Sequence, residues 1–158
     1  MPVFTVSKKL PSMDSYTVAD QSGAAVFGAK HHLGLGKEHW DITDAQGSKV
    51  ATLVHERAHM HATFIISGEG LIDATLTKTN YMPISEKWTL DGGAGQAVLT
   101  GDLADYQWSL TMPDGTLTAT FVRKMVSLHR QYTVTVDDDP RVAVAIAIAL
   151  DADQEEHK

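Results

Sequence analysis

Hydrophobic and polar positions alternate along most of the chain, in short segments that are separated by turn residues. A period of two places successive side chains on opposite faces of a strand, and no stretch before residue 140 keeps a helical period for long. The pattern predicts an all-β body. Its strands are expected near residues 2–6, 14–20, 23–30, 37–44, 48–55, 62–67, 70–79, 86–91, 96–102, 105–111, 116–123 and 131–137.

A long uncharged apolar run follows these strands, from Val142 to Leu150. Branched residues and leucine at every second position would suit a buried strand, but alanine fills the positions between them, and Asp139-Pro140 is a helix-start signal. We therefore expect a helix over about residues 140–153 and a solvated acidic tail over Asp151 to Glu156. A helix that is apolar all round must be enclosed, and at ~1.5 Å per residue this run covers about half of a bilayer core.

Three of the predicted hairpins share one sequence unit. An aromatic residue is followed by an apolar residue two positions later, by aspartate four later and by glycine seven later; the units begin at Tyr16, Trp40 and Trp108, and Met112 replaces the aspartate of the third. Aspartate can accept bonds from its own downstream backbone, and glycine takes the positive φ that closes a type I turn with a bulge. We expect the aromatic residues, with Trp88, in the core or at a barrel rim.

A meander of so many strands curls until its edges meet, because open edges invite aggregation. The fold class predicted is mainly β: a closed antiparallel barrel of about 12 strands around a hydrophobic C-terminal helix, as one domain over residues 1–158, with strands over about 2–137. A barrel of this strand count leaves a lumen too wide for side chains alone, and the apolar helix is a plug of suitable shape.

Composition narrows the function classes. The net charge of −7 argues against a nucleic-acid partner and against docking on an anionic membrane, because both need a basic surface. The chain has no cysteine, which excludes disulfides, thiol nucleophiles and cysteine zinc sites. The segment from Met1 to Lys9 lacks the apolar core of a signal peptide, so a cytoplasmic protein without a transmembrane segment is expected.

The segment His55-Glu56-Arg57-Ala58-His59 matches the HExxH signature of zinc metalloproteases. That chemistry needs the segment on a helix, where both histidines share a face with the glutamate that activates a zinc-bound water. The residues before and after it are β-like, so the match is expected to straddle the end of a strand and a loop. A zinc-dependent hydrolase therefore remains an alternative function.

The other candidate groups are weaker. His59 and His61 would share a strand face, with His55 or the pair His31-His32 as further ligands for adventitious zinc, copper or nickel, but solvated loop histidines are the simpler expectation. Gly34-Leu35-Gly36-Lys37 lacks the Ser/Thr of a phosphate loop, because Glu38 follows it, and Asp91-Gly92-Gly93-Ala94-Gly95 has too few carboxylates for calcium. No catalytic, cofactor-binding or metal-binding residue is assigned.

The order of these motifs resembles the LURP-one-related family. The resemblance covers nearly the whole chain: Tyr16, Asp20, Gly23 and Phe27, then Trp40, Asp44, Gly47 and Val50-Ala51, then Leu99-Thr100-Gly101-Asp102 with Tyr106 and Trp108, then Tyr132-Thr133-Val134 and the apolar helix ending Ala149-Leu150-Asp151. The family shares the tubby-like fold with tubby C-terminal domains and phospholipid scramblases. The resemblance implies a twelve-stranded barrel around a central hydrophobic helix.

The activities known in that fold carry over poorly. Tubby domains bind phosphoinositide head groups through basic side chains, and scramblases are membrane proteins that bind calcium; this acidic chain has neither a basic cluster nor palmitoylated cysteines. We expect a non-enzymatic barrel that acts as a binding or scaffold module for a lipid, a small molecule or a protein. Peripheral phospholipid binding is the second alternative.

Overall fold

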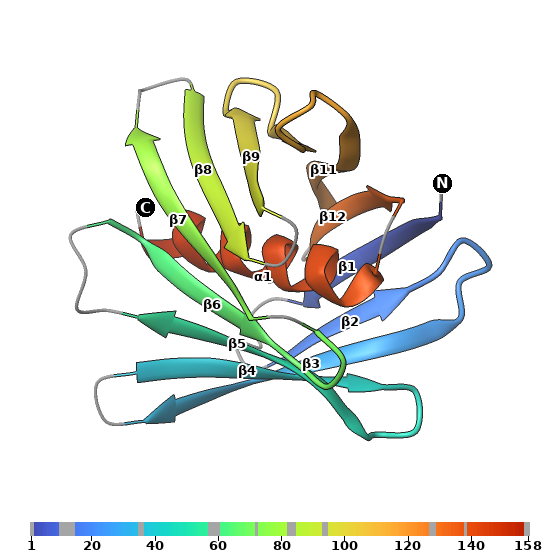
Figure 1. Ribbon diagram of the computed structural model, residues 1–158. Helices are drawn as coiled ribbons and strands as arrows, with labels where there is room; N and C mark the ends of the chain where they lie inside the picture. Colours follow the sequence, from blue (N-terminus) through green and yellow to red (C-terminus); the bar gives the residue numbers. More distant parts are fainter. Residues whose placement is uncertain are drawn as a thin grey trace.

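A computed structural model describes residues 2–9, 15–34, 37–56, 61–71, 73–81, 85–92, 95–126, 129–137 and 139–156. Twelve strands of this described part form a closed barrel in which each strand pairs antiparallel with its neighbours in the sequence, and the first strand pairs with the last. One helix runs through the barrel (Figure 1). The mainly β barrel with a C-terminal helix is therefore confirmed.

The strands are β1 (Val3–Lys9), β2 (Ser15–Ala19), β3 (Ala25–Gly34), β4 (Lys37–Asp44), β5 (Lys49–Glu56), β6 (Thr63–Ser67), β7 (Ala74–Tyr81), β8 (Ser85–Gly92), β9 (Gly95–Asp102), β10 (Gln107–Thr111), β11 (Leu117–Val126) and β12 (His129–Val136), and the helix is α1 (Pro140–Glu156). Most strand positions agree with the predicted ones. The larger differences are at the ends of β1, β3 and β11, which run three or four residues beyond the predicted 6, 30 and 123, and at the start of β7, which begins at Ala74 and not at the predicted 70. The extensions of β1, β3 and β11 include polar residues such as Lys8, His32 and Lys124, and backbone pairing with the neighbouring strands continues through them.

The barrel closes through β1 and β12, which pair from Val3 with Thr135 to Lys9 with His129. β1 also pairs with β2, so both of its edges are bonded. Closure removes the edge strands that an open sheet of this length would expose to other chains.

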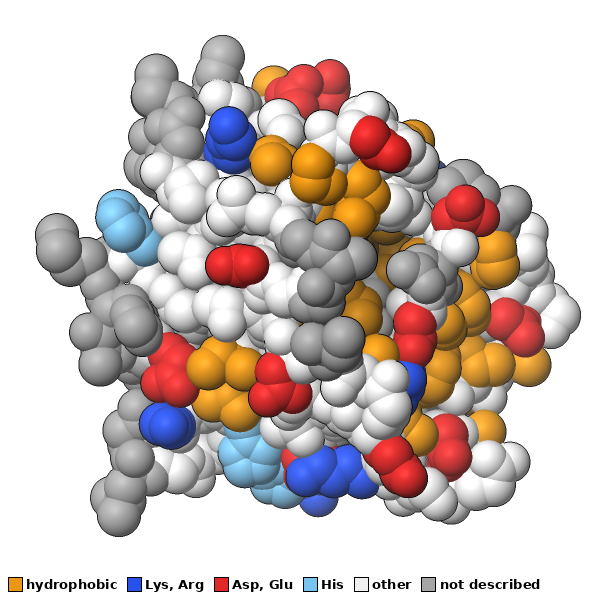
Figure 2. Space-filling view, viewed as in Figure 1, with side chains coloured by type: hydrophobic (Ala, Val, Ile, Leu, Met, Phe, Trp, Pro, Cys, Tyr) orange, Lys and Arg blue, Asp and Glu red, His pale blue; other side chains and the backbone are white. Residues whose placement is uncertain are grey.

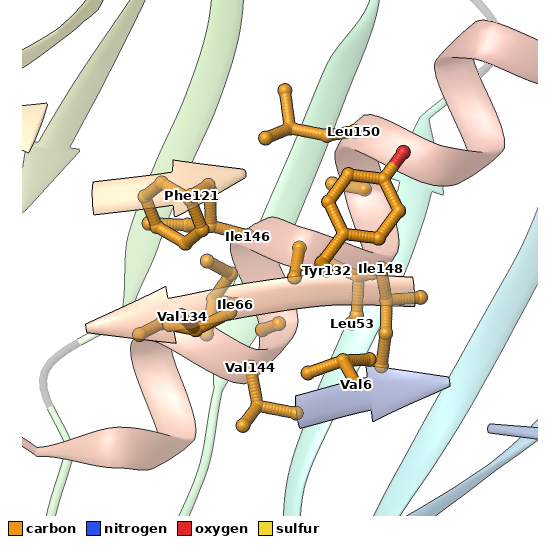
Figure 3. Close-up of a cluster of buried hydrophobic side chains, with 14 of the residues drawn as sticks. Val6, Leu53, Ile66, Phe121, Tyr132, Val134, Val144, Ile146, Ile148 and Leu150 are labelled. Carbon is orange, nitrogen blue, oxygen red and sulfur yellow. The ribbon is translucent and has the colours of Figure 1, made fainter. Parts of the chain in front are cut away.

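The helix fills the lumen. Every residue from Ala143 to Leu150 is at most 3% exposed, so α1 is buried on all sides. Figure 3 shows its side chains among inward-facing residues of β1, β5, β6, β11 and β12. The residues labelled there on the strands are Val6, Leu53, Ile66, Phe121, Tyr132 and Val134. The interior is therefore a packed core. Burying each large apolar side chain contributes about 1.5–3 kcal/mol to the free energy of folding.

The start of α1 is fixed by the predicted cap and by one arginine. Asp139 Oδ1 accepts from the Arg141 backbone N at 3.0 Å, and its carboxylate also accepts from the Arg141 guanidinium. The pKa of Asp139 lies below its ordinary value, chiefly because of the hydrogen bond from the Arg141 side chain. The same guanidinium donates to Val50 O at 3.2 Å and to Glu69 O at 2.7 Å, which ties the start of the helix to β5 and to the turn after β6.

The repeated sequence unit forms the same turn each time. Gly23, Gly47 and Gly115 have φ of +88°, +86° and +88°, and the strand register shifts before each turn. Asp20 and Asp44 each accept two backbone N–H bonds from the turn that follows. The turn at Met112 has the same two main-chain hydrogen bonds as the other turns, from Met112 N to Thr116 O and from Gly115 N to Met112 O. Asp114 accepts from Thr116 N in place of the missing aspartate. The backbone therefore forms this turn without the first aspartate.

Candidate functional site

Charged side chains lie inside the barrel where α1 ends, around Asp151. Its carboxylate accepts from the Tyr16 hydroxyl at 2.6 Å, from Arg130 Nη2 at 2.9 Å and from the Tyr132 hydroxyl at 3.3 Å. Burial raises the pKa of both tyrosines well above the ordinary value, and the negative charge of Asp151 raises them further. One carboxylate thus binds β2 and β12 to the last turns of the helix.

A second part of the same layer surrounds Asp153. Lys78 Nζ lies 2.9 Å from Asp153 Oδ2 and 3.0 Å from Glu86 Oε2, and Glu86 Oε1 accepts from Trp108 Nε1 at 2.7 Å. Burial by itself would lower the pKa of Lys78, but the Asp153 hydrogen bond and the charges of Asp153 and Glu86 raise it above the usual value. The lysine therefore stays charged in the interior.

We call these residues, Tyr16, Lys78, Glu86, Trp108, Arg130, Tyr132, Asp151 and Asp153, the interior network. The predicted solvated tail is wrong at Asp151 and Asp153, which are 1% and 2% exposed. The strands continue past the apolar part of α1 and supply Arg130 and Lys78, which compensate the buried carboxylates. The network fastens the helix to the wall, and its groups are already engaged with one another.

Gly101 leaves the space that the Trp108 ring occupies in the interior network. A Cβ at Gly101 would stand 2.5 Å from the Trp108 ring and 3.0 Å from Glu86 Cγ. The indole of Trp108 therefore packs directly against the β9 backbone while it donates to Glu86, and any larger residue at position 101 would displace it. This is the glycine of the Leu99-Thr100-Gly101-Asp102 motif.

The first two residues of the candidate zinc motif lie on a strand. His55 and Glu56 are the last residues of β5, as the sequence predicted for a motif that straddles a strand end. His55 is buried inside the barrel, whereas Glu56 is partly exposed and lies 3.5 Å from Lys37 Nζ. Successive strand residues face opposite sides, so these two side chains do not share the face that a helix would give them. Arg57, Ala58 and His59 lie outside the described residues.

His55 instead belongs to an inner histidine cluster with His31 and Glu38. Glu38 Oε1 lies 2.7 Å from His55 Nδ1, and Oε2 lies 2.7 Å from His31 Nε2. A carboxylate can only accept, so each imidazole donates from the named nitrogen. The His55 ring also stacks on Phe64 at 4.4 Å, and the His31 ring stacks on Trp40 at 4.8 Å.

An outer histidine cluster lies on the other face of the same strands: His32, His39 and Asp41. Within the described chain these three side chains bring potential metal ligands within 4.8 Å of one another. His32 Nε2 lies 3.3 Å from Asp41 Oδ2, and His39 Nε2 lies 3.8 Å from Asp41 Oδ1. Figure 2 shows histidine side chains beside basic ones at the lower surface of the barrel.

The expectation of solvated loop histidines is thus wrong for His31, His32 and His55, which belong to strands. The adjacent pair His31-His32 is divided between the two faces of β3. His61 is exposed, as expected for a solvated histidine. The expectation for tryptophan is confirmed, since Trp40, Trp88 and Trp108 are buried in the core.

The barrel end where α1 begins carries an acidic rim. We use this name for the carboxylates at the strand ends and turns there: Asp20, Asp44, Glu69, Asp73, Asp91, Asp114, Asp137 and Asp139. Among described residues the basic side chains of this end are Lys49 and Arg141, and each lies against a carboxylate, Asp41 and Asp139 respectively. Figure 2 shows red acidic side chains around orange hydrophobic ones on the right, where α1 begins in Figure 1.

The rim surrounds apolar side chains that are only partly buried. They pack on the core from the mouth of the barrel: Phe4, Phe27, Val50, Leu71, Leu90, Met112 and Val142. Leu117, beside the turn after β10, is 43% exposed. This end therefore combines negative charge with apolar surface.

In the described chain, no helix has both the length and the hydropathy that crossing a membrane requires.

Comparison with known proteins identifies the family of this chain. No curated protein sequence matches the chain. The LURP-one-related family model matches residues 3–151, which include all twelve strands and most of α1. The chain therefore belongs to the LURP-one-related family.

Proposed function

We propose that this protein is a non-enzymatic binding module, and that it recognises a protein segment carrying both basic and apolar side chains. The observation that carries the proposal is the charge segregation at the end where α1 begins. Among the residues that the structure describes, this end has eight carboxylates and two cations, and both cations already lie against carboxylates. A surface potential of one sign attracts partners of the opposite sign and speeds their association.

The apolar mouth supplies the second half of the recognition. Partly buried side chains such as Leu71, Leu90 and Met112 lie within the acidic rim, next to the core. Interfaces gain most of their affinity from a central apolar contact, and the polar rim sets orientation and association rate. A segment with lysine or arginine around one or two large apolar residues matches both parts.

The other partner classes fit less well. Residues 143–150 fill the lumen, so a small molecule would have to displace packed side chains. An anionic lipid surface would be repelled by the acidic rim. The absence of cysteine from all 158 residues agrees with a partner met in the cytoplasm.

The test is a selection of random peptides displayed on phage against the purified protein, followed by affinity measurements with the synthesised peptides. We expect the selected peptides to be rich in lysine, arginine and large apolar residues, and their affinity to fall steeply as salt is added. Acidic or uncharged selected peptides would contradict the proposal. Binding to anionic vesicles in place of peptides would point to the phospholipid alternative.

A matched pair of variants locates the surface. Asp73→Asn with Asp91→Asn removes two exposed charges from the acidic rim, and Asp102→Asn with Asp105→Asn removes two exposed charges near the turn after β9, at the other end. The rim variant should bind the peptides several-fold more weakly, chiefly through slower association, while the control keeps wild-type affinity. Equal losses in both would mean that net charge alone is responsible.

A further inference from the structure

The outer histidine cluster is created by strand pairing. His32 of β3 stands directly opposite His39 of β4, and Asp41 lies two residues beyond His39 on the same face. The two histidines are seven positions apart in the chain, and the β3–β4 hairpin brings their ring centroids to 4.8 Å with planes 17° apart. The positions of the three side chains are therefore fixed by two paired strands of the closed barrel.

The distances suit a small metal ion. Zinc binds imidazole nitrogen and carboxylate oxygen at about 2.0–2.2 Å, so two ligand atoms of a tetrahedral site stand roughly 3.3 Å apart. The His32 and His39 Nε2 atoms lie 3.3 and 3.8 Å from the oxygens of Asp41. All three ligand atoms fall within 4.8 Å of one another, so an ion needs only small side-chain movements.

The cluster is also open to solvent on one side. The side chains of His32, His39 and Asp41 are 42%, 38% and 25% exposed. Asp41 Oδ1 is a buried atom that accepts no hydrogen bond within the described chain; Lys49 Nζ lies 3.2 Å from it. The two oxygens of this carboxylate lie against one imidazole each, Oδ2 against His32 and Oδ1 against His39, and imidazole with carboxylate is a ligand set that zinc accepts.

We propose that the outer histidine cluster binds one divalent transition-metal ion, zinc foremost, through Nε2 of His32, Nε2 of His39 and the carboxylate of Asp41. Water completes the coordination on the exposed side. Two imidazoles and one carboxylate favour zinc, nickel or copper over magnesium and calcium, which prefer oxygen ligands throughout. Binding weakens at acidic pH, because a protonated imidazole cannot ligate a metal. The site does not depend on the acidic rim or on its partner.

Calorimetric titration with zinc chloride tests this on the full chain, purified without a histidine tag and freed of metal by a chelator. We expect one zinc ion per chain. His32→Ala, His39→Ala and Asp41→Asn should each weaken binding about tenfold or more, since even residues that only orient metal ligands contribute that much. His61→Ala is the matched control and should bind as the wild type does, because His61 is an exposed histidine outside the cluster.

Lys49→Met gives a change in the opposite direction. It removes the cation that lies against Asp41, so zinc should bind more tightly than in the wild type. The cluster residues and Lys49 belong to strands and are partly or fully exposed, and unchanged melting temperatures in the absence of metal will show that all the variants fold. The proposal is overturned if the wild type takes up no zinc, or if His39→Ala and His61→Ala bind it equally.

Discussion

At the scale of single residues, Asp151 has the largest effect that we expect in the interior network. Asp151→Asn keeps the size of the side chain and removes the charge that compensates Arg130, which is buried with it. Breaking one side of a buried ion pair costs about 3–5 kcal/mol, because the remaining charge is left in a medium of low polarity. Urea unfolding measures the loss of stability directly.

Asp137→Asn is the control for this change. Asp137 is exposed and follows β12, so its replacement should alter the free energy of unfolding by no more than about 0.5 kcal/mol. If both variants lose the same stability, the interior network does not hold the helix.

Stability should also fall at alkaline pH. Tyr16 and Tyr132 have raised pKa values through burial, and an unfolded chain releases tyrosine protons near pH 10. Above about pH 10 the unfolded state therefore holds fewer protons than the folded one, so stability that is complete below pH 10 is lost as the pH rises toward the folded pKa values. Unfolding in urea as a function of pH measures this.

Tyr16→Phe should make the alkaline loss of stability less steep, because one of the two buried hydroxyls is gone. The same change lowers stability at neutral pH by about 1.5–3 kcal/mol, since a hydrogen bond to a charged group is lost. Tyr106→Phe, at an exposed tyrosine, should reproduce the wild-type pH dependence. A Tyr16→Phe profile as steep as the wild type would exclude this tyrosine as a source of the pH dependence.

Little of the residue-scale chemistry could be predicted from the sequence. His55-Glu56 matched a catalytic signature, yet the strand turns these side chains to opposite faces. Three charged residues lie at inward positions of their strands, two positions from a buried apolar or aromatic residue: Lys78, Glu86 and Arg130. From the sequence alone, a charge at such a position could equally mean that the strand has ended. Their partners, Asp151 and Asp153, are distant in the chain, so no local pattern connects them.

At the scale of elements, α1 is the structure on which the barrel is packed. Ile146 is fully buried in the lumen, so Ile146→Asp places an unpaired charge in the core and should prevent folding. Circular dichroism and the elution volume in gel filtration report this. Ile146→Val is the conservative control and should cost about 0.5–1.5 kcal/mol. A folded Ile146→Asp variant with unchanged thermal stability would mean that the helix is not the core.

The elements themselves were largely predictable, because each carries its own local signal. Asp139-Pro140 marked the helix start, and Asp139 does accept the Arg141 backbone bond. The alternation of apolar residues at 142–150 suited a strand as well; the cap and the alanines decided for the helix. The role of Arg141 was not predictable, because its acceptors Val50 O and Glu69 O are distant from it in the chain.

At the scale of the whole molecule, closure depends on β1. A chain that lacks residues 1–9 would leave the edges of β2 and β12 unpaired and open the lumen to water. We expect that chain to lose cooperative thermal unfolding and to aggregate. Near-ultraviolet circular dichroism and gel filtration check this.

Adding the missing strand as a separate peptide provides the control. A synthetic peptide of residues 1–9 can pair with both free edges and should restore the near-ultraviolet signal, whereas a peptide of the same composition in scrambled order should not. A truncated chain that melts cooperatively at the wild-type temperature would show that closure is dispensable.

The strands, the repeated turn and the capped apolar helix follow from the amino-acid sequence alone, because alternation, turn chemistry and helix capping act over a few neighbouring residues. It also carried the motif order of the LURP-one-related family. Which charges are buried and which side chains meet depends on how the distant segments pack together. His32 meets His39 through the register of β3 and β4, and Asp151 meets Arg130 because α1 lies inside the barrel against β12; pairing and packing join segments that are distant in the chain, so no single segment contains them.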